Sequence, residues 1–351
     1  MIDIQTYGTS LTFDGDILKS ATFKKGNEER PLWKRIERLT PNEMIIWVDR
    51  FDSLCPIACE WALAQAIEDA SEIIIPKRTQ YVRTILSEIN RLVWLTTYLG
   101  RVIGSFGQRT MLQQIFVLRE QVFTIQEELT GARILPQALI VGGVRRDLPL
   151  GNIQKIQVFT KEWSELWKVW KNLVTGDELL ESRLNGLIKI DTVTIEKLGW
   201  WGIVGKASGV NYDSRRHRPH GAYPYLDFNL VSKSEGDAKS RFEVALEEVE
   251  VALKLIDQIV KDIPEQSENQ GTVPVPRALR PGFYSSSAES AKGPIISCLE
   301  VSDKNIITTV RLFSAGQRVW PVIDHLFKDM RGEDFEPAFA SLGITPEDSE
   351  I

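Results

Sequence analysis

Five stretches of this chain repeat apolar residues at the spacing of an α-helix, and no other feature limits the possible folds more. In the stretch after Pro76, residues Ile85, Ile89, Leu92 and Leu99 recur every three or four positions and would line one face of a helix. Helices with a single apolar stripe bury it against one another, usually in a bundle. The sequence predicts helices over about 54–71, 77–99 (ended by Gly100), 108–130 (ended by Gly131), 151–175 and 237–262.

The segments between these helices predict small β elements and loops. Alternating apolar and polar residues predict a β-hairpin that turns at Asp14-Gly15-Asp16 and another over 295–312 that turns at Asp303-Lys304-Asn305. We expect a short helix before Pro41, loops with small strands over 177–235, and an irregular loop over 264–293. The fold class is therefore mostly α with small β-hairpins (α+β). We expect one domain, 1–351, made of an N-terminal hairpin (1–25), a helical bundle (50–176 and 237–262), a loop-rich cover (177–235) and a C-terminal hairpin and tail (288–351).

Composition excludes several classes of protein. No run of about 18 apolar residues is present, so we expect no membrane span, and the first residues lack the pattern of a secretory signal. Three cysteines are too few for a disulfide framework. A net charge of −6 without a clustered basic face argues against nucleic acid as a partner.

Two segments have the outline of a metal site but lack its ligands. The run Arg50-Phe51-Asp52-Ser53-Leu54-Cys55-Pro56-Ile57-Ala58-Cys59 resembles the first cysteine motif of nickel-iron hydrogenase large subunits, with one of that motif's two cysteines. The run Ala340-Ser341-Leu342-Gly343-Ile344-Thr345-Pro346-Glu347-Asp348 resembles the second motif and contains no cysteine. The resemblance implies that a dinuclear centre held by four thiolates cannot form. The related 49 kDa-type subunit of respiratory complex I also has aspartate at the equivalents of 52 and 348.

Further motifs occur in the order of the family that this complex I subunit (the D-type, or 49 kDa-type, subunit) shares with those hydrogenases. They are Pro76-Lys77-Arg78-Thr79-Gln80-Tyr81-Val82-Arg83, Glu88-Ile89-Asn90-Arg91-Leu92, Thr130-Gly131-Ala132-Arg133, the run from Gly142 to Gly151, the run from Ala207 to Arg216, Glu235-Gly236-Asp237, and Ala288-Glu289-Ser290-Ala291-Lys292-Gly293. Each motif alone is weak, but together they identify the chain as similar to a diverged complex I member. The fold implied is the central long-helix bundle of the hydrogenase large subunit.

The resemblance implies a peripheral-arm subunit of an NADH (or ferredoxin)-quinone oxidoreductase. Its location would be the cytoplasmic (or matrix or stromal) face of an energy-transducing membrane. The partners implied are an iron-sulfur small subunit (B-like), C-like and I-like chains of the same arm, and an H-like membrane chain. This chain itself would bind no cofactor, because the iron-sulfur cluster lies in the partner and quinone lies at the interface. Arg50 and Arg145 would face the cluster, where positive charges favour its reduced state.

The departures from the family concern the quinone site. In the complex I subunit, quinone lies between a histidine in an early hairpin and a tyrosine, and this tyrosine is Ser53 here. The early histidine loop is not found, and all three histidines follow residue 216. Ser105 stands for an aspartate that couples to the histidine, and a serine is a poor replacement for a positioned acid. We therefore expect altered quinone contacts, with chamber candidates Asp52, Ser53, Ser105, Thr110 and Asp348.

Several alternatives remain open from the sequence. The chamber could be a packed remnant in a non-catalytic structural subunit that has lost both metal and quinone sites. Cys55 and Cys59, four residues apart, are weak candidates for metal ligands, because a site would need two more, such as Asp52 and Asp348. The basic run 215–220 fits an anion or partner contact or a solvated loop. An active hydrogenase would contain nickel.

Overall fold

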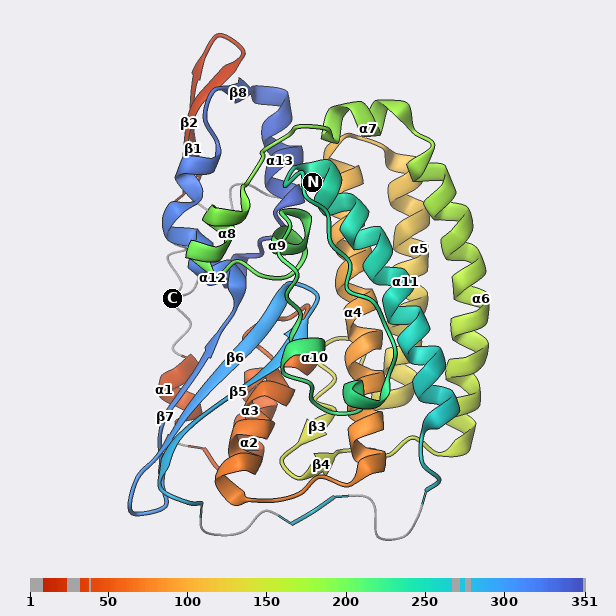
Figure 1. Cartoon of the computed structure of the whole chain (residues 1–351), viewed down its shortest axis with the longest axis vertical. Coiled ribbons are helices and arrows are strands. Elements are labelled where there is room, and N and C mark those ends of the chain that lie inside the picture. Colours follow the sequence, from red (N-terminus) through yellow and green to blue (C-terminus); the bar gives the residue numbers. More distant parts are fainter. Residues whose placement is uncertain (1–8, 24–31, 38, 267–271, 275–278, 350–351) are drawn as a thin grey trace.

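In the computed structural model, the long helices stand side by side along the long axis of the molecule (Figure 1). The structure describes residues 9–23, 32–37, 39–266, 272–274 and 279–349. The bundle consists of α3 (Pro56–Ser71), α4 (Lys77–Ser105), α5 (Arg109–Thr130), α6 (Leu150–Thr175) and α11 (Ala238–Asp262). α4 packs against α5 and α11, so it is the central helix. The predicted fold class and the five predicted helices are confirmed.

One predicted helix boundary is wrong. Gly100 does not end α4, which continues to Ser105. A Cβ atom at Gly100 would lie 2.4 Å from a ring carbon of Phe116 in α5, so this glycine allows the two helices to approach closely. Gly131, in contrast, ends α5 as predicted, with φ of 86° in the left-handed region that favours glycine.

A row of tryptophans packs α6 onto α5. The rings of Trp163 and Trp167 stack with centroids 5.7 Å apart, and those of Trp167 and Trp170 with centroids 5.3 Å apart. The indole N–H of Trp163 donates to the carbonyl oxygen of Leu118 at 3.0 Å, and that of Trp170 donates to the carbonyl oxygen of Met111 at 3.0 Å. All three side chains are buried, so the stripe forms part of the core.

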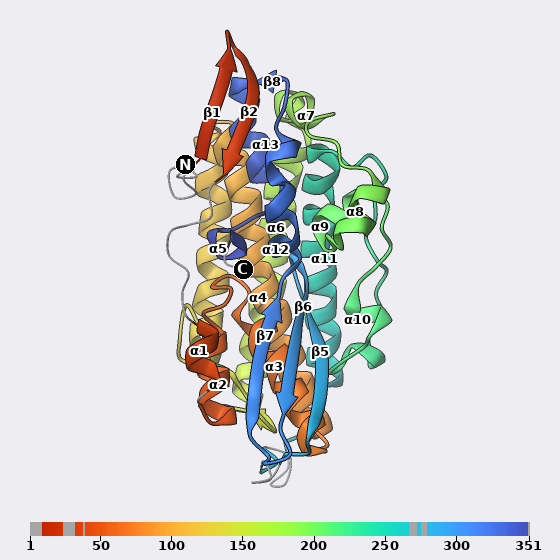
Figure 2. The same ribbon diagram turned by 90° about the vertical axis from the view of Figure 1, so that its left-hand side faces the viewer.

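A three-stranded antiparallel sheet covers α3, as the view in Figure 2 shows. Its order is β5 (Gly282–Ser290), β6 (Gly293–Val301) and β7 (Ile307–Phe313). The β6–β7 hairpin is confirmed, with Asn305 at φ 59° in its turn. The expected irregular loop over 264–293 is wrong where β5 forms. Its serines lack the alternation of a half-buried strand, yet Ser286 is buried and donates to the carbonyl oxygen of Ala62 in α3.

The N-terminal hairpin is confirmed and is joined by a segment from far along the chain. β1 (Thr9–Asp14) and β2 (Ile17–Phe23) turn at Gly15, and β8 (Met330–Arg331) pairs with β2, where Leu18 faces Met330. Aromatic residues of the later segment, such as Phe327 and Phe339, surround Phe23 in a second apolar cluster. This segment comprises α12 (Ala315–Val319), η3 (Trp320–Leu326), η4 (Gly332–Asp334), α13 (Phe335–Ser341) and η5 (Pro346–Ser349).

Short helices, rather than the expected small strands, occupy the described cover over 177–235. They are α7 (Glu178–Leu184), α8 (Thr192–Leu198), α9 (Ile203–Ala207), α10 (Ser214–His217) and η2 (Tyr223–Tyr225). Asp177, Asp191 and Asp213 each accept a hydrogen bond from a backbone N–H of the helix that follows. Such caps stabilise helix starts without any long apolar period, which explains why periodicity missed them.

The remaining elements lie before and beside α3. They are α1 (Leu32–Ile36), which confirms the short helix before Pro41, α2 (Pro41–Val48), which the sequence analysis did not predict, and the small hairpin of β3 (Leu139–Ile140) and β4 (Gly143–Val144). Within the part of the chain that the structure describes, no helix combines the length and apolar character that crossing a bilayer requires. That the chain forms one domain stays a prediction.

We predict that Trp163→Ala lowers the free energy of unfolding by about 3–5 kcal/mol, because it leaves a cavity in the core and removes the hydrogen bond to the Leu118 carbonyl oxygen. Val169→Ala on the same helix is the control, since Val169 is 71% exposed and should change stability by less than about 0.5 kcal/mol. Chemical denaturation followed by circular dichroism measures both. Equal losses for the two variants would contradict the packing role.

Candidate functional site

The ammonium group of Lys292 brings Asp52 and Asp348 together. Lys292 lies in the turn between β5 and β6, Asp52 precedes α3, and Asp348 lies in η5. The Lys292 Nζ lies 2.8 Å from Asp52 Oδ2, 2.7 Å from Asp348 Oδ2 and 3.0 Å from Thr345 Oγ1. All four residues are buried. Three segments that are distant in sequence therefore meet at one positive charge.

Hydrogen bonds from neighbouring residues hold both carboxylates in place. Asp52 Oδ1 accepts the backbone N–H groups of Leu54 and Cys55, each at 3.1 Å. Asp348 Oδ2 accepts the backbone N–H of Thr345 at 2.9 Å, and Asp348 Oδ1 accepts the hydroxyl of Ser314 at 2.8 Å. The two side chains are thus oriented by donors other than the lysine.

The electrostatics of this cluster keep Lys292 charged. Burial alone would lower the pKa of Lys292, but Asp348 and Asp52 outweigh it and raise the pKa above its ordinary value. Burial raises the pKa of Asp52, and the attraction of Lys292 opposes this rise. Burial also raises the pKa of the Cys55 and Cys59 thiols, so both stay protonated at neutral pH. Two carboxylates thus share one ammonium in a buried site.

The dinuclear metal of the hydrogenase resemblance does not fit these residues. An ammonium group lies between the two carboxylates, and the site offers two cysteines, Cys55 and Cys59, where such a metal requires four thiolates. Cys55 and Cys59 are buried and joined by a backbone hydrogen bond within one helical turn. In the described ranges, no group of three or more His, Cys, Asp or Glu side chains is arranged to hold a metal ion.

The other predicted chamber residues fall into two groups. Ser53 lies at the cluster and donates its hydroxyl to Glu347 Oε1 at 2.6 Å. Ser105 lies at the end of α4 and donates to the carbonyl oxygen of Val102 at 2.6 Å, and Thr110 is exposed in the first turn of α5. The structure therefore gathers Asp52, Ser53 and Asp348 and leaves the other two at the α4–α5 connection.

A cavity of about 10 Å³ adjoins Lys292 and Asp348. Its walls include Trp94, Tyr98 and Trp200. This volume is about that of one water molecule and far below the roughly 300 Å³ at which small-molecule pockets begin. The cavity beside Asp348, as this chain alone forms it, is therefore too small for an aromatic ring.

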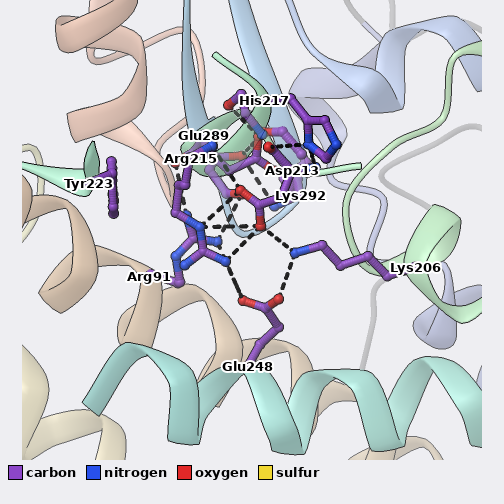
Figure 3. Close-up of polar contacts among 12 residues, drawn as sticks. Arg91, Lys206, Asp213, Arg215, His217, Tyr223, Glu248, Glu289 and Lys292 are labelled. Atoms are coloured by element: carbon purple, nitrogen blue, oxygen red, sulfur yellow. Dashed lines mark hydrogen bonds and ion pairs between the residues drawn. The ribbon is translucent and has the colours of Figure 1, made fainter. Parts of the chain in front are cut away.

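A second buried ionic cluster lies beside the first (Figure 3). Lys206 and Arg215 reach the two carboxylate oxygens of Glu248 from opposite sides, at 2.6 and 2.9 Å. Both cations also bind Asp213, at 2.6 and 2.7 Å. Arg91 donates to the carbonyl oxygens of Glu289 and Ser290. The second cluster is therefore connected by hydrogen bonds to the turn that carries Lys292.

The basic run 215–220 is divided by this cluster. Arg215 is buried and paired, so the interpretation of the whole run as a solvated loop or partner contact is wrong for it. Arg216 and Arg218 are exposed, and for them that interpretation stays open. His220 is buried beside Trp61, and burial lowers its pKa to about 4, so its ring is neutral at neutral pH.

Arg50 and Arg145, the residues expected to face a partner, are arranged around a buried carboxylate. Arg50 Nη1 lies 2.9 Å from Asp49 Oδ1, and Arg145 is exposed and donates to Gln137 Oε1 at 3.3 Å. Burial raises the pKa of Asp49 to about 6, while Arg50 and Arg145 both act to lower it. The two arginines thus form a partly exposed positive region near the start of α3.

Glu60 in α3 is a buried carboxyl group next to this region. Its Oε2 accepts the backbone N–H groups of Ala138 at 3.0 Å and Leu139 at 2.8 Å. Its Oε1 has no hydrogen-bond partner among the described residues. Burial raises the pKa of Glu60 to about 8, so the group carries a proton at neutral pH.

Two groups of comparisons agree on the class of protein. The description "Respiratory-chain NADH dehydrogenase, 49 Kd subunit" belongs to the family model that matches residues 105–282. The D-type subunit of the NADH-quinone oxidoreductase of Desulforamulus reducens is 30% identical over 295 residues, covering 84% of this chain and 80% of that protein. The second D-type subunit of the same enzyme in Rhizobium meliloti is 31% identical over 255 residues, covering 73% of this chain and 63% of that protein.

A solved structure has the same fold. A chain of the membrane-bound sulfane sulfur reductase, an archaeal respiratory membrane complex, superposes with a TM-score of 0.92 at 25% identity, covering 98% of this chain and 94% of that chain. The fold and the sequence thus both match subunits of respiratory membrane complexes. The chain belongs to the family of 49 kDa-type (D-type) subunits of respiratory-chain NADH dehydrogenase.

Lys292 is the site residue that the sequence did not single out, because it occurs only as one position of the motif Ala288 to Gly293 that resembles a family loop. A search for a cation to balance two aspartates in apolar surroundings could have found it, because buried charges are paired. Its partners lie 240 residues before it and 56 after it, beyond any local pattern.

We predict that Gly202→Ala destabilises the fold by more than about 3 kcal/mol. The φ of 77° and ψ of −148° at Gly202 belong to a region open mainly to glycine, and a Cβ there would lie 2.1 Å from the Lys292 carbonyl oxygen. Gly186→Ala is the control, because Gly186 has φ of 73° but open space around it, so only strain of roughly 1–2 kcal/mol remains. Urea unfolding measures the free energy of unfolding of both variants. Equal losses for Gly202→Ala and Gly186→Ala would contradict the close approach of Gly202 to the Lys292 carbonyl oxygen.

We predict that Glu60→Gln removes a decline of stability with rising pH. Because the pKa of Glu60 is about 8 in the fold and near 4.5 in the unfolded chain, the folded state holds an extra proton between these values. Stability is then greatest below the lower value and falls as the pH rises through the upper one. Glutamine keeps an acceptor for Ala138 and Leu139 without titrating. Denaturation from pH 5 to 9 tests this, and parallel curves for both proteins would refute it.

Proposed function

We propose that this chain is a peripheral-arm subunit of a complex I-like NADH-quinone oxidoreductase that packs on an iron-sulfur subunit and forms one wall of a quinone chamber with altered contacts. Its family and the archaeal respiratory complex of the same fold support the subunit role. One observation carries the altered contacts. The polar groups near the headgroup position are bound internally, Ser53 to Glu347 and Asp52 to Lys292.

The proposed partners follow from the family and from the exposed charges. An iron-sulfur (B-like) subunit would lie against the positive region of Arg50 and Arg145, where fixed positive charge favours a reduced cluster. The C-like, I-like and H-like chains would complete the arm on the cytoplasmic (or matrix or stromal) face of the membrane. Quinone would lie between chains, because the cavity beside Asp348 within this chain is only about 10 Å³.

The second candidate is a structural subunit that has lost both the metal and the quinone sites. The small cavity and the ion pairs of Lys292 favour it, because a site without free polar anchors does not orient a ligand. On this proposal the bundle provides a surface on which neighbouring subunits assemble. The two candidates differ in whether turnover depends on side chains near Ser53.

The test uses the assembly purified from native membranes. We predict that an iron-sulfur chain co-purifies, and that Ser53→Phe lowers quinone-dependent turnover roughly tenfold or more, because small displacements at a reacting centre are costly. Ser105→Phe tests the α4–α5 connection in the same way. Ser182→Phe, at an exposed position of α7, is the matched control and should leave turnover unchanged.

The outcomes separate the candidates. Unchanged turnover in an intact Ser53→Phe assembly would favour the structural subunit, while the absence of any iron-sulfur chain from the preparation would contradict both. The archaeal complex with this fold is named for sulfane sulfur reduction, so the assay also includes polysulfide as acceptor. Turnover with polysulfide but not with any quinone would mean that polysulfide, rather than quinone, is the electron acceptor of the assembly.

A further inference from the structure

We infer that Lys292 is a tethered cation that fills a cation site lined by oxygen atoms, and that the chain binds a free cation there once this side chain is shortened. The inference concerns the interior of this chain and does not depend on the proposed acceptor. It assigns to Asp52, Thr345 and Asp348 the role of cation ligands.

The geometry is that of a coordination site. Oxygen atoms of Asp52, Thr345 and Asp348 converge on the Lys292 Nζ at 2.7–3.0 Å. Lys292 lies in the turn between β5 and β6, whereas Asp52 lies in the loop before α3, Thr345 directly before η5 and Asp348 within η5. The oxygen atoms therefore surround one position, that of the Lys292 Nζ, which is occupied by a side chain from a different segment.

The oxygen atoms are held in place without help from the lysine. Backbone N–H groups of Leu54 and Cys55 fix Asp52, and the backbone N–H of Thr345 fixes Asp348. In addition, Gly316 packs against Asp348, since a Cβ at Gly316 would lie 2.3 Å from the carboxyl carbon. A shortened side chain at 292 would thus leave a preformed site rather than a collapsed one.

The charge balance requires a cation at this point. Without Lys292, two buried carboxylates would face each other with no positive partner, which is strongly unfavourable. A free cation would relieve this repulsion. Carboxylate and hydroxyl oxygens suit an alkylammonium ion, through hydrogen bonds, or a hard divalent ion such as Mn²⁺.

Lys206 provides an internal comparison. It also binds two buried carboxylates, Asp213 and Glu248, each at 2.6 Å. Arg215 contacts the same two carboxylates at 2.7 and 2.9 Å. Removing the Lys206 amine therefore leaves that pair with a cation, and no added ion is needed.

The experiment compares Lys292→Ala, Lys292→Met and Lys206→Ala in the purified assembly. Lys292→Ala should lower the Tm of this chain by roughly 5 °C or more, and n-propylammonium chloride should restore most of the loss, while equal sodium chloride should not. Mn²⁺ should bind Lys292→Ala at one site per chain, as measured by electron paramagnetic resonance. Lys292→Met, which fills the space, and Lys206→Ala should show neither rescue nor this Mn²⁺ site.

Other results would overturn the inference. A folded Lys292→Ala protein that responds to neither cation would show that the oxygens do not form a cation site, as would equal rescue of Lys206→Ala. If Lys292→Ala and Lys292→Met do not accumulate, adding Asp52→Asn to Lys292→Met should restore accumulation, because it removes one unpaired charge. Failure of this double variant would mean that unpaired negative charge is not what Lys292 relieves, and the inference would be wrong.

Discussion

The charge of Lys292 connects the parts of this fold that the helical bundle alone does not. The bundle explains how α4 packs with α5 and α11, whereas the loop before α3, the β5–β6 turn and η5 meet at this ammonium group. Removing one partner from such a buried group leaves an unpaired charge, which costs more than the intact group contributes. The position of the C-terminal segment relative to α3 therefore depends on this side chain together with the hydrogen bond from Ser53 to Glu347.

The two buried ionic clusters act as neighbouring parts of one polar interior. Arg91 of α4 binds the backbone at Glu289 and Ser290, two to three residues before Lys292. Arg215, Lys206 and their acids fasten the cover segment to α11. The Glu289 carboxyl group accepts the backbone N–H of Ser214 at 2.9 Å. Burial and Asp213 raise its pKa to about 7, so this group titrates near neutral pH. Both clusters place fixed charges in the interior of the fold.

The parts of the fold that follow a local rule were predictable from the sequence, and the rest were not. Apolar spacing predicted the five long helices, and turn residues predicted both hairpins. Periodicity could not show that Gly100 allows helix contact instead of ending α4, because that depends on Phe116 of another helix. It also missed β5, whose serines are buried through contacts with α3. In the site, a resemblance pointed to Asp52 and Asp348, whereas the cation between them came from a separate segment with no local signal.

The long sequence separation in the Lys292 cluster has a consequence for how the protein is made. Asp52 is synthesised 240 residues before its lysine. At roughly 5–20 residues per second, the ribosome needs on the order of ten to fifty seconds to cover that distance. During this interval the nascent N-terminal half has an acidic group at the start of α3 with no counter-ion. The contact between the loop before α3 and the β5–β6 turn therefore forms only after the later segment has been synthesised.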